Sequence, residues 1–412
     1  MESKPCILDT RQTFGKDKKK FLYRCFPDDR SSPILVPFEI QPQFQKKRVA
    51  YYVIVEYTLP VGKLLNNLGE VSDPEHYYDY LLHCKKLHVS QRSFQQAVLS
   101  KLKDLSWDLP FRDARVFTIY GASTMDFDDG FSVDSEKVSI YITCVPYILE
   151  HLGLWNHLTS RTSSIYFPTK RYPLLPGLLS TLCSLNEGTL RPCLVLDLYK
   201  DRTEWSMCTV KIHKNYTYEN VTGQDYSNLL AHSNTRDSET MVHHYMTLYN
   251  KTAGSMLEKG IYLKVHTPES LPPDWLPAYS RHYSTYEHEG DYAQLTSPIR
   301  RLVDILNMTQ LTRQLGLYTY TSDPHLRYDH LEYINLSFRS IRKAQTTAKL
   351  LHLFDQNAHQ VFEGVVWEDH VYLKEIGLLL RLTDHAPGTY LFRLYVFHDE
   401  AFLKRKVRLQ IE

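Results

Sequence analysis

Three aspartates lie within four positions of one short segment, TIYGASTMDFDDG, which begins at Thr118. The runs VFTI and VSIYITCV on either side are rich in β-branched and aromatic residues, which favours two strands joined by the aspartate-bearing loop. Asp126, Asp128 and Asp129 can then converge their oxygens on one point. The fold must hold these like charges together, so the loop constrains the chain more than any other feature.

This loop has two interpretations. Oxygen-only ligands suit a hard divalent cation, Mg²⁺ or Mn²⁺, which keeps part of its water and uses substrate phosphates as further ligands. Aspartate is also common in solvated turns, because its side chain bonds to the nearby backbone. The sequence DFDDGF excludes an EF-hand, since it lacks that loop's alternating ligands.

Two further segments have both a binding and a structural interpretation. TSPIRRLVD, from Thr296 to Asp304, predicts a helix that starts at the Ser-Pro pair and carries Arg300 and Arg301 in its first turns. Free amides and guanidinium groups there would grip phosphate, whereas ordinary capping with solvated arginines is the alternative. In SSIYFPTKRYPLLP, Tyr166 could stack on a base or pack as an ordinary strand tyrosine.

Composition limits the class of protein. The 412 residues predict two or three domains, and the net charge of +1 gives no global basic field for nucleic acid. Seven cysteines without a CxxC pair argue against a disulfide framework or a zinc site and favour a reducing compartment. The polar N-terminus and the lack of a long apolar run predict a non-secreted, intracellular protein with no membrane partner; cytoplasm, nucleus and virion are not distinguished.

Periodicity divides the chain into three parts. Strand-like runs, including KKRVAYYVIVEYTLP from Lys46 to Pro60, dominate the first 70 residues, and one or two helices follow. Helical spacing predicts further helices at 240–262, 296–315 and 331–356. Strand patterns return after Gly364. The predicted fold class is therefore α+β.

In this order, the segments resemble the RNB family of hydrolytic 3′-to-5′ exoribonucleases, which includes ribonuclease II, ribonuclease R and the hydrolytic subunit of the exosome. The resemblance runs through A-S-T-x-D-x-D-D, SIYFP, YPLLP, LCSLNEG, TYENV, MVHHYMTLYN and YAQLTSPIRR. It implies an RNB domain at 96–357, preceded by a cold-shock-like OB barrel with a trailing helix at 1–95. A shortened OB-type barrel would follow at 358–412.

The resemblance also implies a chemistry. Family members hold Mg²⁺ or Mn²⁺ with four aspartates, thread single-stranded RNA 3′-end first and release nucleoside 5′-monophosphates. By position, three of the four metal ligands match Asp126, Asp128 and Asp129. The arginine that stabilises charge on the phosphate matches Arg300. The implied RNA contacts are Tyr166, which stacks on the terminal base, and Arg301.

The chain departs from the family at several positions. Tyr120 stands where the first aspartate is expected, and a neutral phenol is a poor Mg²⁺ ligand, although its hydroxyl could hold a metal-bound water. Further departures, expected around the same pocket, are Cys144, Leu302, Met308 and His243. Several changes at one pocket indicate relaxed demand on catalysis.

Two functions follow. One is an RNB-type protein that binds single-stranded RNA with catalysis weakened or lost, and that serves in a larger ribonucleoprotein or virion assembly with other protein subunits. The other is an active, metal-dependent exoribonuclease with a rearranged site. The residue that separates them is Tyr120.

Overall fold

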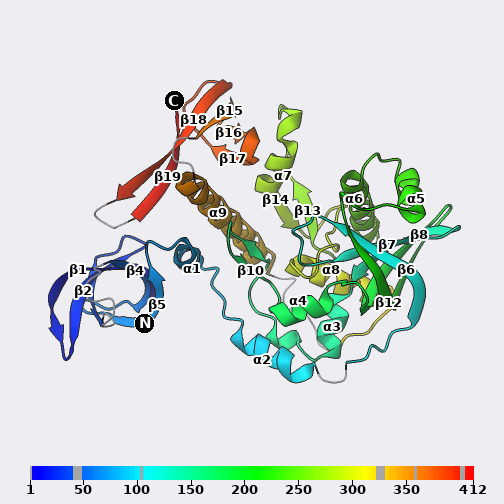
Figure 1. Ribbon diagram of the computed structural model, residues 1–412, viewed down its shortest axis with the longest axis horizontal. Helices are drawn as coiled ribbons and strands as arrows, with labels where there is room; N and C mark the ends of the chain where they lie inside the picture. Colours follow the sequence, from blue (N-terminus) through cyan, green and yellow to red (C-terminus); the bar gives the residue numbers. More distant parts are fainter. Residues whose placement is uncertain (1, 40–48, 103–104, 322–329, 357–359, 400–403) are drawn as a thin grey trace.

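The computed structural model describes residues 2–39, 49–102, 105–321, 330–356, 360–399 and 404–412. In Figure 1 an N-terminal sheet, a central α+β region and a C-terminal sheet surround the long helix α9 (Leu331–Gln356). The predicted α+β class, with an RNB-type fold between two OB-type units, is confirmed. The exact domain limits at 95/96 and 357/358 stay predictions.

The N-terminal sheet curls into a half-barrel. Its strands are β1 (Ser3–Asp17), β2 (Lys20–Pro27), β3 (Ile34–Phe38), β4 (Ala50–Glu56) and β5 (Lys63–Glu70), in the order β3-β2-β1-β4-β5. A parallel bridge between Leu35 and Val61 brings the two edges together around a core that contains Cys6, Leu8 and Val53. The predicted strand from Lys46 coincides with β4, while residues 46–48 lie outside the described residues.

Two helices connect this sheet to the central region, as predicted. They are α1 (Pro74–Cys84) and α2 (Arg92–Lys101). Asp73 starts α1 because its carboxylate accepts the Glu75 amide at 2.8 Å, and Pro74 suits the first helical position.

A closed five-stranded barrel carries the aspartate loop. Its strands are β6 (Phe111–Tyr120), β7 (Asp129–Val133), β8 (Lys137–Thr143), β11 (Leu190–Tyr199) and β12 (Thr203–Thr217), in the order β11-β12-β6-β7-β8. The short strand β7 was not predicted, because five residues give too little alternation to detect. The loop therefore joins β6 to β7, and Asp129 is the first residue of a strand.

The other helices and short strands of the central region surround the barrel or, in the case of α7, pack against the C-terminal sheet. The helices are α3 (Val145–His151), α4 (Gly177–Cys183), α5 (Gln224–Ser233), α6 (Ser238–Met256), α7 (Leu276–Tyr283) and α8 (Leu302–Gln314). The short strands pair as β9 (Ile165–Tyr166) with β10 (Arg171–Tyr172), and β13 (Tyr262–Val265) with β14 (Ser284–Glu287).

Helix α8 starts six residues later than predicted. The Asp304 carboxylate accepts the Ser297 amide at 2.7 Å, and the Arg300 and Arg301 amides both bond to the Ser297 carbonyl. This turn ends at Arg301, which is extended and caps the helix. The two arginines therefore precede α8, and the predicted placement in its first turns is wrong.

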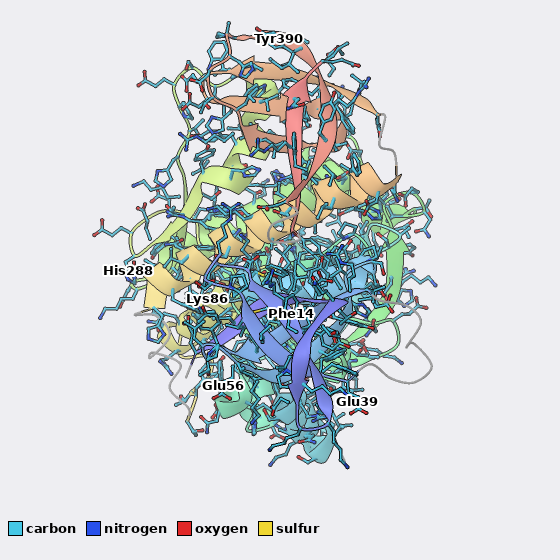
Figure 2. All side chains as sticks on the ribbon, turned by 90° about the vertical axis from the view of Figure 1, so that its left-hand side faces the viewer. Phe14, Glu39, Glu56, Lys86, His288 and Tyr390 are labelled. Atoms are coloured by element: carbon cyan, nitrogen blue, oxygen red, sulfur yellow. The ribbon has the colours of Figure 1, made fainter. Side chains whose placement is uncertain are left out.

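Helix α9 links the three parts. It contacts α1, β9, β14 and the C-terminal strands, and Figure 2 shows it crossing between the N-terminal and C-terminal sheets. The C-terminal sheet contains β15 (Val361–Trp367), β16 (His370–Leu373), β17 (Leu378–Arg381), β18 (Gly388–Asp399) and β19 (Lys404–Ile411), in the order β17-β16-β15-β18-β19. Within the described ranges, no helix has the length and apolar character needed to cross a membrane.

A charged cluster stabilises the barrel at the end opposite the aspartate loop. Asp197 on β11 is 4% exposed and accepts hydrogen bonds from Arg112 at 2.9 and 3.1 Å, Lys137 at 3.0 Å and Ser139 at 2.6 Å. Burial opposes ionisation, but the hydrogen bonds from Arg112, Ser139 and Lys137 outweigh it and lower the pKa of Asp197.

Asp197→Asn should lower the free energy of unfolding by about 3 kcal/mol at neutral pH, because two partly buried cations lose their carboxylate. A lowered carboxyl pKa gives stability that is present above the unfolded-state pKa, about 4, and is lost as the pH falls through the folded-state pKa. Urea unfolding between pH 7 and pH 3 tests both statements. Asp201→Asn, in the exposed turn after β11, is the matched control; equal losses in the two variants would contradict the expectation.

Candidate functional site

A cleft of about 670 Å³ opens where the β6–β7 loop leaves the barrel. Its lining comes from that loop, from β9 and β10, from α6 and from residues 292–301. Every predicted site residue lies on it: Tyr120, Asp126, Asp128, Asp129, Tyr166, Arg300 and Arg301. The structure thus brings together residues that the sequence spreads over 180 positions, while their roles stay predictions.

Tyr120 closes the aspartate loop through its hydroxyl group. The Tyr120 oxygen accepts the backbone N–H groups of Asp128 at 2.7 Å and Asp129 at 2.8 Å. It donates its own proton to Asp129 Oδ1 at 2.5 Å. The hydroxyl therefore has three partners and is not placed to hold a metal-bound water.

Burial governs the charge of the two inner carboxylates. Asp128 and Asp129 are 3% and 5% exposed. Burial raises the pKa of Asp129 to about 6 despite the Tyr120 hydrogen bond and the nearby Arg300. It raises the pKa of Asp128 to about 8, against the opposing effects of Arg300 and the Ile299 amide. Burial also raises the pKa of Tyr120 well above its usual value, so the phenol stays neutral.

The other contacts of the loop also come from the protein. Asp128 Oδ1 accepts the Ile299 amide at 2.9 Å, and its Oδ2 lies 3.8 Å from Arg300 Nε. Asp126 forms an ion pair with Arg171 on β10. The Ile299 amide lies in the segment whose amides were expected to bind phosphate, but it donates to Asp128 instead.

Arg301 differs from Arg300 in its surroundings. Its side chain is mostly buried and donates to Asp304 Oδ1 at 2.8 Å. The Arg300 side chain is more exposed at the cleft and donates to Ser297 Oγ at 2.9 Å. The geometry therefore favours Arg300 as a phosphate contact and gives Arg301 a structural position.

As arranged, the three aspartates do not fit a shared divalent cation. Within the part of the chain that the structure describes, no group of three or more His, Cys, Asp or Glu side chains could hold a metal ion. Asp129 Oδ2 is buried without a hydrogen-bond partner in that same part, so one oxygen remains available. The ligand set that the sequence predicted is present in the cleft but engaged by other protein groups.

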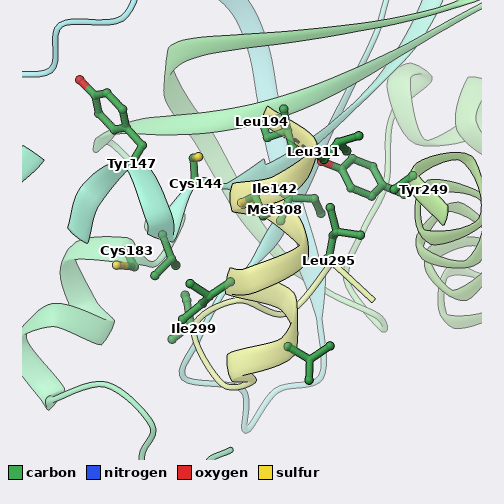
Figure 3. Close-up of a cluster of buried hydrophobic side chains, with 14 of the residues drawn as sticks. Ile142, Cys144, Tyr147, Cys183, Leu194, Tyr249, Leu295, Ile299, Met308 and Leu311 are labelled. Atoms are coloured by element: carbon green, nitrogen blue, oxygen red, sulfur yellow. Dashed lines mark hydrogen bonds between the residues drawn. The ribbon is translucent and has the colours of Figure 1, made fainter. Parts of the chain in front are cut away.

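Three of the departures from the family lie away from the cleft. Cys144 and Met308 are fully buried, and Figure 3 shows them within the hydrophobic cluster around α8. Leu302 belongs to the same core. Only Tyr120 and His243 line the cleft. The expectation that all five surround one pocket is wrong, because the motif positions alternate between the core and the cleft.

A groove rich in positive charge, which no sequence pattern indicated, adjoins the cleft. A cavity of about 550 Å³ shares Tyr292 and Gln294 with the cleft, and it shares Arg342 with another cavity of about 750 Å³. The described lining of these two cavities contains no Asp or Glu. Besides Arg301, which is held by Asp304, its cations are Lys85, Arg281, Arg339, Arg342, Lys343 and Arg381, here called the basic groove.

Arg342 lies close enough to Arg339 for the two positive charges to affect each other. Burial lowers the pKa of Arg342, and the neighbouring Arg339 lowers it further. Since the cations of the basic groove come from distant stretches of sequence, the net charge of +1 conceals them. This groove is the kind of surface that attracts a polyanion.

Comparison with known proteins shows which family this region resembles. Residues 109–224 match the family model described as the RNB domain. Over this segment the chain resembles the RNB family. Ribonuclease R of Escherichia coli (strain K12) is 29% identical over 197 residues, which cover 42% of this chain and 24% of that protein. The chain thus matches about a quarter of the length of that curated relative.

Solved structures share the fold of this protein. Mycoplasma genitalium RNase R in complex with double-stranded RNA gives a TM-score of 0.67 at 15% identity, covering 100% of this chain and 96% of that chain. Yeast Ssd1, described as a pseudonuclease, gives a TM-score of 0.59 at 13% identity, covering 92% and 65%. Because a ribonuclease and a pseudonuclease share the fold, the fold does not decide whether this protein cleaves RNA.

Tyr120→Phe should lower the free energy of unfolding by about 3 kcal/mol, because two backbone N–H groups of the buried loop lose their acceptor. Tyr218→Phe is the control: Tyr218 lines the same cleft, and its hydroxyl has no hydrogen bond to the described residues. Its expected loss is within about 0.5 kcal/mol. Urea denaturation in EDTA measures both. Equal stability of the two variants would show that the Tyr120 hydroxyl does not hold the loop.

Proposed function

We propose that this protein is a member of the RNB family that binds single-stranded RNA along the basic groove and in the cleft, and that it cleaves RNA weakly or not at all. The observation that carries the proposal is the bonding of the Tyr120 hydroxyl. It accepts hydrogen bonds from the Asp128 and Asp129 backbone amides and donates one to the Asp129 carboxylate. A catalytic carboxylate at that position would face the cleft as a ligand. Here the Tyr120 phenol is neutral and bonds to Asp128 and Asp129 of the adjacent loop.

Binding is supported by charge and by stacking. The cations of the basic groove suit the phosphates of a nucleic acid strand. Tyr166, 42% exposed at the mouth of the cleft, offers a ring on which an unpaired base can stack. RNase R of Mycoplasma genitalium has been solved with double-stranded RNA and with ribose-methylated single-stranded RNA. The need for an unpaired base favours a single strand for this chain.

One observation favours the second candidate function, an active exoribonuclease that uses Mg²⁺ or Mn²⁺. Asp129 Oδ2 is a buried oxygen without a described hydrogen-bond partner, and such an oxygen suits a hard cation. Against it stand the protein contacts that already engage Asp126, Asp128 and Asp129. A place in a ribonucleoprotein or virion assembly, with other protein subunits, stays a prediction.

Cleavage is tested with a labelled oligo(A) in Mg²⁺ and in Mn²⁺. We expect no burst of mononucleotides from the wild type and the same result for Asp128→Asn. Loss of one electrostatic group at an active site already costs about 10²- to 10³-fold in rate. Efficient release by the wild type that Asp128→Asn abolishes would establish the second candidate function instead.

Binding is tested by fluorescence anisotropy with the same oligonucleotide over a range of salt. Arg339 and Lys343 are exposed on successive turns of α9 in the basic groove. Replacing either with Ala should weaken binding and reduce the salt slope by about 1. Lys214→Ala, an exposed change on the barrel that is paired with Glu187, should leave both unchanged. Identical behaviour of all three variants would contradict the assignment of the groove.

A further inference from the structure

Arg171 lies where the aspartate site needs a positive charge. Its guanidinium pairs with Asp126, whose side chain is 9% exposed, while the Arg171 side chain is 25% exposed at the cleft. The same guanidinium lies 5.7 Å from the centre of the Tyr166 ring. One side chain thus contacts both a predicted metal ligand and the predicted stacking residue.

The hairpin of β9 and β10 fixes this position. Lys170 and Tyr172, on either side of Arg171, both bond to Asp79 on α1, at 3.0 and 2.7 Å. Because successive side chains of a strand point to opposite faces, Arg171 is directed away from α1 and into the cleft. An ordinary surface ion pair has no such anchors on both sides.

Each of the three carboxylates has at least one protein partner. Asp126 has Arg171, Asp128 has the Ile299 amide with Arg300 nearby, and Asp129 has the Tyr120 hydroxyl. Two guanidinium groups therefore supply the positive charge for a cluster that would otherwise repel itself. A divalent ion would have to displace Arg171 before it could bind the Asp126 oxygen that Arg171 holds.

We propose that Arg171 is the resident cation of the aspartate cleft and that the cleft binds RNA without a divalent metal. This inference rests on the proposed RNA-binding function. It assigns to one side chain the neutralising role that the family resemblance gave to Mg²⁺ or Mn²⁺. RNA affinity should then be the same in EDTA and in Mg²⁺ at matched ionic strength.

Mn²⁺ binding, followed by the EPR signal of the free ion without RNA, tests the inference directly. We expect no stoichiometric binding by the wild type and tighter binding, by about tenfold or more, in Arg171→Met. Lys170→Met, on the same hairpin but directed toward Asp79, should behave as the wild type. Stoichiometric Mn²⁺ binding by the wild type, or no gain in Arg171→Met, overturns the proposal.

Oligo(A) anisotropy provides the second readout. Arg171→Met should bind RNA about tenfold more weakly in EDTA, a change of 1.4 kcal/mol, and added Mn²⁺ should restore the affinity. Arg171→Lys keeps the charge and should need no metal, while Arg171→Gln serves if the Met variant does not fold. Mn²⁺ binding by the wild type only when oligo(A) is present would overturn the proposal. It would mean that RNA binding releases Arg171 from Asp126 and lets the metal bind there.

Failure of the proposed function has a different signature. If the wild type binds no oligo(A) in any buffer, the RNA-binding function is wrong. The Mn²⁺ titration of Arg171→Met still decides, on its own, whether Arg171 is the resident cation.

Discussion

The burial of carboxylates in a poorly solvated loop is the constraint on which the site depends. Asp128 and Asp129 are almost completely buried, and burial is the largest cause of the raised pKa of each. The protein meets this cost with groups of its own: a phenol hydroxyl, a backbone amide and two guanidinium groups. The loop can therefore keep its shape as part of the folded chain, where a metal enzyme would depend on its ions.

The fold supplies these groups from separate places. The barrel places Tyr120 and Asp129 at the ends of two strands, and the turn before α8 presents Ile299 and Arg300. The β9–β10 hairpin adds Arg171, and α9 joins that hairpin to the basic groove. The cleft, the basic groove and the position of the Tyr166 ring thus follow from one packing arrangement around α9.

Much of this arrangement could be predicted from sequence, and the failures have physical causes. Periodicity gave α9 at its observed limits, and the motif order indicated which residues share a cleft. The start of α8 was misplaced because a carboxylate, Asp304, holds the preceding turn. Arg171 had no local signal, since its direction depends on Asp79, 92 positions earlier. The basic groove was hidden because its cations are distant in sequence and balanced overall.

Each carboxylate pairs with a different partner. The effect of one substitution that would restore a metal site therefore depends on whether the others are already present. A mutation of Tyr120 to aspartate would add a fourth negative charge while Arg171 still holds Asp126. Loss of Arg171 first would leave Asp126 without its partner beside two buried carboxylates. Either single step passes through a less stable protein, so the present site resists reversal by one substitution at a time.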